Sequence, residues 1–301
     1  MPMIFGFNPP RVSYIGPNST ILSPILISSQ LELVNLIVDC VDFNKNLGLN
    51  LTCIDFSEIQ FSPDFFTSNL NEEIPDVYQA LTIAQESIAR SESRLCLFIP
   101  KNYFLGSQIQ EIRDKTFQII SKTSEILEAI GINYPSIIIR VGSAYGNRKK
   151  TLASFCSSIR NLGKSTISRL SIMNDDKPSL FSITDLLTGV FYETGIPLTF
   201  RILPHQFNDG GLSIREALFL SCSTWVDKTK PLFIYSESID YDTNGIPVTS
   251  KVSGHISYRI PTFGIALDVI IESSSKEDAC LGYMMNHKSL PPIIINRINT
   301  K

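Results

Sequence analysis

The sequence predicts an α/β protein, a single (β/α)8 barrel of the TIM type, and two patterns support this prediction. Short apolar, β-branched runs recur along the 301 residues, and most are near-continuous rather than alternating. Such runs are typical of parallel strands that are covered on both faces. Between them, apolar residues recur every three to four positions, as they do in helices. Eight strands that alternate with helices over some 300 residues predict the barrel.

The eight expected strands share this apolar character. They are residues 3–8, 49–57, 94–100, 135–142, 168–175, 196–204, 231–238 and 266–274.

Helices are expected between these strands. Stripes of apolar residues at helical spacing run through residues 33–43, 77–88, 106–130 and 152–162. Gly163 is expected to end the last of these stripes. Ser182 with Asp185 resembles a capping box that opens a further helix, which Gly195 is expected to close. Another helix is expected to begin within residues 213–220.

The chain shows no linker, internal repeat or low-complexity segment that would separate a second domain. We therefore expect the barrel to occupy residues 1–285. Residues 286–301 are expected to form a C-terminal extension that is packed or binds a partner.

Composition narrows the class of protein. Hydrophobic residues make up 43% of the chain and charged residues 18%, which suits a sizeable core and argues against disorder. The net charge of −3 gives no global field that favours nucleic acid, so a DNA contact would need a local basic patch. The six cysteines form no CxxC pair, which indicates buried free thiols in a reducing compartment. Neither a secretory signal nor an apolar run of bilayer-spanning length is present, so a soluble intracellular protein with no membrane span is expected.

Active sites of such barrels lie at the carboxyl ends of the strands. Here those ends carry two arginines, Arg140 and Arg201, where histidines and carboxylates would be expected. In RLSIMNDDK an apolar strand runs into Asn174 and Asp175, but Met173 occupies the position that faces the barrel edge. The strand-end residues are Asp55, Ser57, Pro100, Arg140, Asn174, Asp175, Arg201, His205, Ser236 and Glu272.

Ordered motifs along the chain also carry a family resemblance. They are VGSAYGNRKKTLASF, RLSIMNDDK, GIPLTFRILPHQ, LSIREAL followed by STW, SGHISYRI and DVIIESSSKE, with weaker matches in GFNPPRVSYIG and NKNLGLNLTCIDFSEIQF. In order and spacing the chain resembles the UV damage endonuclease family, a group of metal-dependent barrels related to endonuclease IV and the xylose-isomerase-like enzymes. The resemblance implies cleavage of the phosphodiester bond 5′ to a DNA lesion by divalent metals, held mainly by histidines with Glu and Asp.

The chain departs from that ligand set at most positions. The residues that correspond to the family's metal site are Ser57, Ile99, Arg140, Met173, Arg201, Pro204, Ile234, His255 and Glu272. His255 and Glu272 keep ligand identity and are weak candidates for a single metal, whereas Met173 replaces a bridging carboxylate. Two ligands cannot hold a multi-metal cluster, so no metal or other cofactor is expected. Instead, Arg140 and Arg201 are expected to replace the metals electrostatically by pairing with Glu272 and with Asp175.

Several other polar residues are expected to have ordinary structural roles. His205 and His287 are expected to be surface histidines or satisfied by local hydrogen bonds, and Trp225 to serve packing. The segment GNRKK with Arg160, Lys164 and Arg169 is more typical of a solvated helix face than of a DNA footprint.

Three functions therefore stay open. The first, which we favour, is a catalytically degenerate homologue that serves as a non-catalytic binding or structural component of a larger assembly, with protein partners and no assignable catalytic residue. The second is a divergent DNA repair endonuclease that nicks 5′ to UV lesions with Mn or Zn at His255 and Glu272. The third is a metal-free binder of phosphate or nucleic acid, with Arg140, Arg201 and Tyr103 as candidate contacts.

Overall fold

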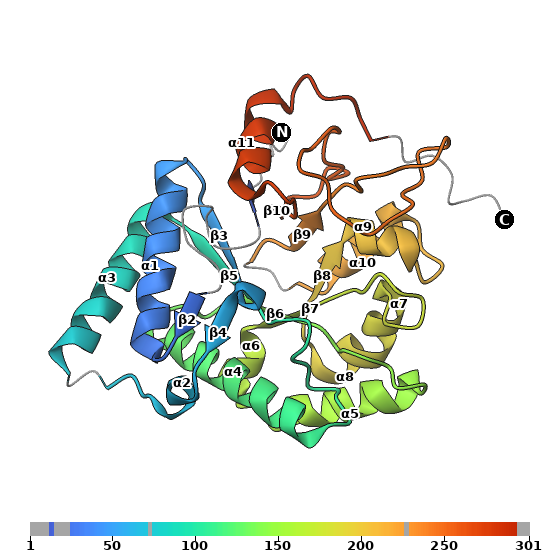
Figure 1. Ribbon diagram of the computed structural model, residues 1–301. Coiled ribbons are helices and arrows are strands. Elements are labelled where there is room, and N and C mark those ends of the chain that lie inside the picture. The colour runs from blue at the N-terminus through green and yellow to red at the C-terminus, as the bar shows by residue number, and fades with distance from the viewer. Residues whose placement is uncertain (1–11, 15–24, 72–73, 226–228, 294–301) are drawn as a thin grey trace, which may run out of the picture.

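The computed structural model describes residues 12–14, 25–71, 74–225 and 229–293 (Figure 1). Within this part of the chain, an eight-stranded parallel sheet runs in the order β1-β10-β9-β8-β7-β6-β5-β3. The strands at its two ends, β1 (Val12–Tyr14) and β3 (Leu51–Asp55), lie close to each other, so the sheet nearly closes into a barrel. The predicted TIM-type α/β fold is confirmed.

Seven of the eight barrel strands fall inside the segments expected from the sequence. Besides β3 they are β5 (Arg94–Phe98), β6 (Ile137–Ile139), β7 (Leu170–Met173), β8 (Leu198–Arg201), β9 (Leu232–Tyr235) and β10 (Asp268–Ile271). Apart from Asp55, every residue of these seven strands is buried. Their near-continuous apolar runs therefore reflect cover on both faces, as predicted.

The prediction for the first strand is not tested by the described residues. It placed that strand at residues 3–8, which lie outside the described residues, whereas the barrel position beside β10 is taken by β1. Three residues are too few to show a period, and pairing with Val269–Ile271 is what identifies β1 as the strand. The sequence also did not indicate a separate two-stranded parallel sheet of β2 (Ile25–Ile27) and β4 (Ile59–Phe61).

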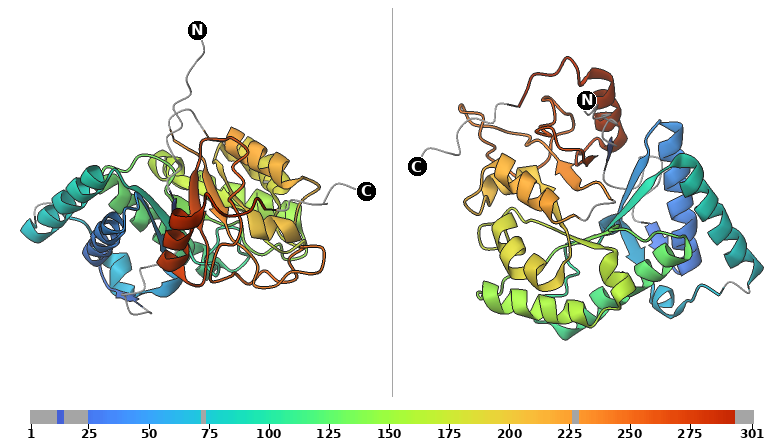
Figure 2. Two further views of the ribbon diagram at one scale, coloured as in Figure 1. Left: turned by 90° about the horizontal axis from the view of Figure 1, so that it is seen from above. Right: turned by 180° about the vertical axis from the view of Figure 1, so that it is seen from behind.

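Helices cover the outside of the barrel (Figures 1 and 2). They are α1 (Gln30–Asn46), α2 (Pro63–Thr67), α3 (Pro75–Ser91), α4 (Gln110–Ala129), α5 (Arg148–Arg160), α6 (Lys164–Ser168), α7 (Ile183–Leu186), α8 (Tyr192–Thr194), α9 (Ile202–Phe207), α10 (Ile214–Ser223) and α11 (Lys276–Asn286), with the 3-10 turn η1 (Phe56–Glu58) and the π-helical turn η2 (Leu187–Phe191). Each of the expected apolar stripes lies on one of these helices.

Helix ends match the predicted signals with one exception. The capping box of Ser182 and Asp185 is present at the start of α7, and Gly195 ends α8 with a φ of 70°, which an L side chain rarely adopts. Gly163, however, does not end the helix before it. Helix α5 already ends at Arg160, and Gly163 is the N-cap residue of the short α6.

The interior of the barrel is filled with side chains below the carboxyl ends of its strands. The inner cluster consists of Leu51, Cys53, Cys96, Phe98, Ile138, Met173, Trp225, Leu232, Ile234 and Ile270. At the amino ends of the strands, Arg94 donates to Asp268 over 2.9 Å, and its guanidinium lies 5.2 Å from the ring centre of Trp225. Trp225 donates its indole N–H to Leu198, so its predicted packing role is confirmed. Side chains thus fill the barrel interior and the amino ends of the strands. A site is therefore expected at the carboxyl ends.

The six cysteines are all free and five are buried, as predicted. Across the described ranges, no helix combines the length and the apolar character needed to cross a bilayer. Helix α11 ends at Asn286. The division of the chain into a barrel at residues 1–285 and a C-terminal extension at residues 286–301 stays a prediction.

The capping box at the start of α10 supplies a first testable prediction. Ser213 accepts a hydrogen bond from the N–H of Glu216, whose carboxylate accepts in return from the N–H of Ser213. Ser213→Ala is expected to lower the free energy of unfolding by about 1 kcal/mol. Urea denaturation measures it, with Ser223→Ala at the exposed end of the same helix as the control; equal effects of the two variants would contradict the capping role.

Candidate functional site

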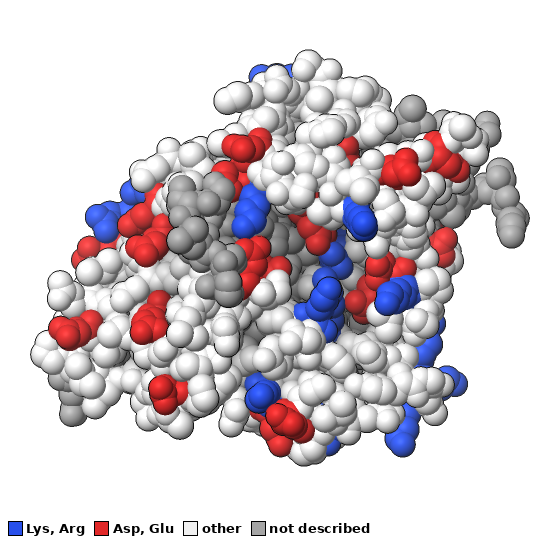
Figure 3. Space-filling model, in the orientation of Figure 1, with Lys and Arg blue, Asp and Glu red and all other residues white. Residues whose placement is uncertain are grey.

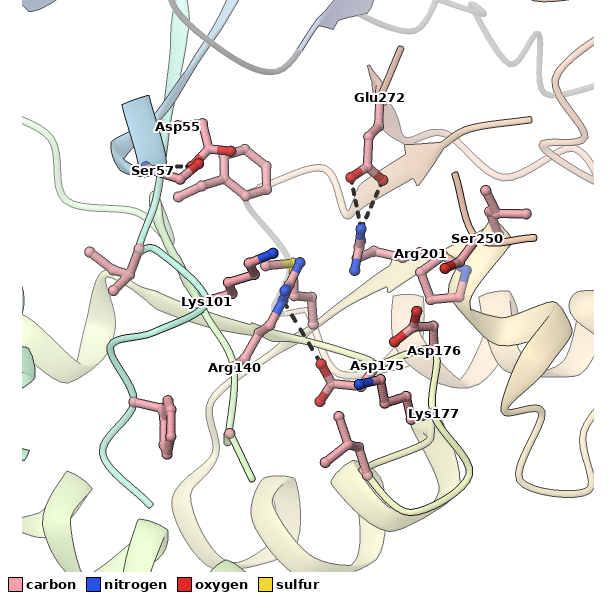
Figure 4. A pocket seen from close by; sticks show the side chains of 18 of the residues that line it. Asp55, Ser57, Lys101, Arg140, Asp175, Asp176, Lys177, Arg201, Ser250 and Glu272 are labelled. Carbon is pink, nitrogen blue, oxygen red and sulfur yellow. Dashed lines mark hydrogen bonds and ion pairs between the residues drawn. The ribbon is translucent and has the colours of Figure 1, made fainter. Parts of the chain in front are cut away.

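A cavity of about 620 Å³ opens at the carboxyl ends of the strands (Figure 4). Acidic and basic side chains gather around a hollow on this face of the molecule (Figure 3). The charged residues that line the cavity are Lys101, Arg140, Lys177, Arg201, Asp55, Asp175, Asp176 and Glu272. Its apolar lining includes Phe98 and Met173 of the inner cluster together with Leu203.

Arg201, the last residue of β8, forms the strongest ion pair in the cavity. Its Nη2 donates to both carboxylate oxygens of Glu272, which follows β10, over 2.8 and 2.9 Å. Arg201 is only 9% exposed, so the pair lies largely out of water. Burial by itself lowers the pKa of Arg201, but the charge and hydrogen bonds of Glu272 outweigh it, and the net shift is upward. Glu272 therefore stabilises the charged form of Arg201.

Arg140, directly after β6, is much less well paired. Its Nε lies 3.9 Å from Oδ1 of Asp175, which is beyond hydrogen-bond distance. Burial lowers the pKa of Arg140, and the nearby charge of Arg201 lowers it further. Burial also raises the pKa of Asp175 to about 6, although both arginines oppose that shift.

Three buried polar atoms of this site have no hydrogen-bond partner among the described residues. They are Nε of Arg140, Nε of Arg201 and Oδ2 of Asp175. An unpaired buried donor or acceptor costs roughly 1–3 kcal/mol. The polar groups of the cavity are therefore only partly satisfied by the protein itself.

The two strand ends that present these groups are tied together by Asn174. This fully buried side chain accepts from the N–H of Arg201 over 2.8 Å and donates to its carbonyl oxygen over 3.1 Å. The N–H of Asp175 donates to Phe181, and Asn208 donates to the carbonyl oxygen of Asp175. Asn174 thus positions Arg201, and Asp175 faces Arg140, the arginine contact that was expected for Asp175.

Comparison with known proteins connects this chain to one family. The sequence profile of the family described as UV-endonuclease UvdE matches residues 36–299. The chain belongs to the UvdE family.

Curated relatives of this UvdE-family protein carry the same description. A UV DNA damage endonuclease of Clostridium perfringens (strain 13 / Type A) is 28% identical over 174 residues, which cover 56% of this chain and 41% of that protein. One of Bacillus pumilus (strain SAFR-032) is 29% identical over 167 residues, 52% of this chain and 50% of the relative. The chain thus spans two fifths to one half of these relatives. A putative UV-damage endonuclease of Acanthamoeba polyphaga mimivirus is 22% identical over 275 residues, 85% of this chain and 82% of the relative.

Solved structures agree on the fold. The crystal structure of SacUVDE superposes with a TM-score of 0.73 at 22% identity and covers 93% of this chain and 98% of its own. Endonuclease IV from Thermus thermophilus superposes with a TM-score of 0.58 at 13% identity, with the same coverage. At these identities the likeness establishes the fold, and the site has to be judged on its own residues.

The cavity of this UvdE-family protein brings together most of the positions that the sequence resemblance assigns to the family's metal site. They are Ser57, Ile99, Arg140, Met173, Arg201, Pro204 and Glu272. Ile234 does not line the cavity and packs in the inner cluster. His255 is exposed on the loop after β9, where its Nδ1 lies 3.4 Å from the hydroxyl of Ser253. The structure thus does not place His255 and Glu272 together in the cavity lining.

Other candidates also lie away from the cavity. Tyr103 is partly buried and packs against the large hydrophobic core that helix and strand residues form together. His205 is buried rather than on the surface, with its Nε2 3.0 Å from the carbonyl oxygen of Leu212, and burial lowers its pKa. His287 is only partly exposed, and its Nδ1 lies 3.0 Å from the carbonyl oxygen of Met284. Neither histidine is available to the cavity.

Two lysines and a serine of the cavity were missed in the sequence. Lys101 and Lys177 follow strands β5 and β7 by a few residues, and that position was a signal that could have identified them. Ser250 comes from the long loop between β9 and β10, and no sequence pattern indicates its place. Part of that loop is anchored by Glu237, which accepts from the hydroxyl of Tyr235 and from backbone N–H groups of residues 257 and 258.

The arginines of the basic segment around α5 have partners within the protein, whereas its lysines are exposed. Arg148 pairs with Asp185, and Arg160 pairs with Glu193 over 2.8 Å. Arg169 is buried and donates its Nε–H to the carbonyl oxygen of residue 132. These contacts favour the structural interpretation over a DNA footprint.

The residues present do not fit the metal cluster that the family resemblance implies. Across the described part of the chain, no three His, Cys, Asp or Glu side chains are grouped so that they could hold a metal ion. The cavity lining contains no histidine, and the carboxylate of Glu272 is already engaged by Arg201. Imidazole and carboxylate donors are what such ions require.

Proposed function

We propose that this UV-damage-endonuclease-like protein has lost metal-dependent strand incision and acts as a non-catalytic binding protein. One observation carries the proposal. The guanidinium groups of Arg140 and Arg201 line the cavity, and Arg201 binds Glu272. By the sequence resemblance, the two arginines stand where the family has metal ligands.

The charge of these groups opposes a divalent ion. A cation in the cavity would have to break the buried pair of Arg201 and Glu272 before it could use that carboxylate. It would also approach two fixed positive charges in a poorly solvated space, where repulsion at close range costs several kcal/mol. The lack of metal-binding side chains and the presence of two arginines therefore both disfavour the binding of a divalent ion.

An incision assay tests the proposal. The purified protein is incubated with UV-irradiated duplex DNA, and separately with abasic duplex DNA, in the presence of Mn²⁺. We expect no nicking above a protein-free reaction, while the UV DNA damage endonuclease of Bacillus pumilus serves as the positive control. We also expect elemental analysis to find no tightly bound equimolar Zn or Mn.

The competing function, a divergent repair endonuclease, makes the opposite prediction. Nicking 5′ to the lesion that depends on Mn²⁺ and disappears in Glu272→Gln would establish it and refute the proposal. A role within a larger assembly, with protein partners, stays a prediction of the same proposal, and co-purification of a stoichiometric partner from its native source is the test. DNA stays a possible ligand because the UvdE relatives are described as acting on damaged DNA.

A further inference from the structure

We propose that the cavity binds a small phosphorylated ligand that carries hydroxyl groups, with its phosphoryl group held by Arg140 and Lys101. The inference rests on the proposed function, because divalent metals bound in the cavity would occupy the space that the ligand needs. It goes further by naming the chemical class of the ligand and the residues that recognise it.

The first argument is the unequal pairing of the cavity cations. Arg201 is engaged by both oxygens of Glu272, but Arg140 forms no hydrogen bond with any described residue, and its contact with Asp175 spans 3.9 Å. Lys101 has no ion pair among the described residues either. Both side chains reach into the cavity (Figure 4). Cations that lack a close counter-ion, with Lys177 of the lining among them, suit the cavity to an added anion.

The second argument is the buried donor of Arg140. Its Nε has no partner among the described residues although it is out of water, while the whole side chain keeps 23% exposure toward the cavity. A guanidinium presents its N–H groups as a planar fork that matches two oxygens of a phosphoryl group. A ligand phosphate would therefore bind the exposed part of a guanidinium that has no hydrogen-bond partner among the described residues.

The third argument concerns the rest of the ligand. A volume of about 620 Å³ lies in the range of small-molecule sites. Carboxylates of Asp55 and Asp176 and the hydroxyls of Ser143 and Ser250 offer partners for ligand hydroxyl groups. Phe98 and the other apolar lining residues offer a surface for the ligand's carbon skeleton. This mixture suits a phosphorylated polyol better than inorganic phosphate alone.

The same lining disfavours a nucleic acid backbone as the ligand. The acidic groups in the cavity would repel a polyanion that follows the surface, and the nearby cations Arg148 and Arg160 are already in ion pairs. A small ligand brings only one phosphoryl group into the cavity, where it can pair with Arg140. It therefore meets less of this repulsion than a nucleic acid backbone does.

Titration calorimetry on the full chain, with a metal chelator present, tests the inference. The probes are ribose 5-phosphate, inorganic phosphate, ribose and a short single-stranded oligonucleotide. We expect ribose 5-phosphate to bind more tightly than inorganic phosphate, and ribose not to bind. Arg140→Gln is expected to weaken the binding of ribose 5-phosphate by about 10-fold or more. The matched control, Lys149→Gln on the exposed face of α5, is expected to leave the affinity unchanged.

A second variant guards against a folding defect. Lys101 is exposed, so Lys101→Gln leaves the packing intact and is expected to weaken ribose 5-phosphate binding several-fold. Absence of binding by both phosphate probes, or equal affinity of Arg140→Gln and the unmodified protein, would overturn the inference. So would binding of the oligonucleotide through Arg140 without binding of ribose 5-phosphate. Incision of DNA with Mn²⁺ would instead refute the proposed function, so the two failures are distinguishable.

Discussion

Glu272→Gln is expected to lower the free energy of unfolding by about 3–5 kcal/mol. Removing one partner of a buried ion pair leaves the other charge without compensation in a poorly solvated space. Arg201 is 9% exposed, and the hydrogen bonds of its side chain in the described structure are those to the two carboxylate oxygens of Glu272. Arginine cannot respond by losing its proton, because its pKa lies far above the physiological range. Urea denaturation near pH 7 measures the change.

The control for this prediction is Glu193→Gln, which removes the partner of Arg160 in an exposed ion pair. Exposed pairs contribute at most about 1 kcal/mol, so this variant should change stability little. A second arm replaces both partners, Arg201→Met with Glu272→Leu, and is expected to recover most of the loss because no unpaired charge remains. An effect of Glu272→Gln as small as that of the control would show that water reaches Arg201.

Asp175→Asn is expected to stabilise the protein by about 2–3 kcal/mol above pH 6, with the gain fading as the pH falls toward 4. Burial raises the pKa of Asp175 to about 6 in the folded protein, from 3.8 for the free side chain. Between these values the folded protein keeps a proton that the unfolded chain releases. Rising pH therefore favours the unfolded chain until the folded carboxyl has also ionised, and above pH 6 the whole penalty is present. Asparagine carries no such charge and escapes the penalty.

Urea denaturation of both proteins from pH 4 to pH 8 measures this difference. Asp114→Asn, an exposed carboxylate on α4, is the control, and its effect should stay below about 0.5 kcal/mol at every pH. A constant difference between Asp175→Asn and the unmodified protein across this range would contradict burial as the cause of the shift. Destabilisation above pH 6 would mean that Asp175 is needed as the counter-ion of Arg140.

Most of the barrel could be predicted because its strands are buried on both faces. Runs such as that of β7 are apolar almost throughout, and a short run of that kind between helical stripes is typical of a buried parallel strand. The first strand could not be predicted in the same way. The three residues of β1 carry no period, and their place depends on hydrogen bonds to β10, more than 250 residues away in the chain. Gly163 shows the same limit for helices, since a glycine near a helix end suits the end of one helix and the start of the next.

The candidate site could be located from the sequence but not resolved into contacts. Strand ends of a parallel barrel meet at one edge, so the order of strands was enough to place Arg140, Met173, Arg201 and Glu272 near one another. Their pairing could not be predicted, because Arg201 and Glu272 are 71 residues apart and either arginine could have reached the carboxylate. Exclusion of His255 from the cavity lining likewise follows from the path of a long loop rather than from any local pattern.

The sequence by itself determined the barrel class and the family resemblance, because these depend on residue identity and on periodic burial. Tertiary structure alone decided that Arg201 is paired at hydrogen-bond distance, whereas Arg140 faces its counter-ion only at longer range. That difference arises from distances of 2.8 Å and 3.9 Å between charged atoms, and from the water excluded around them. Electrostatic energies at such separations change by several kcal/mol with distance and solvation, which residue order does not encode.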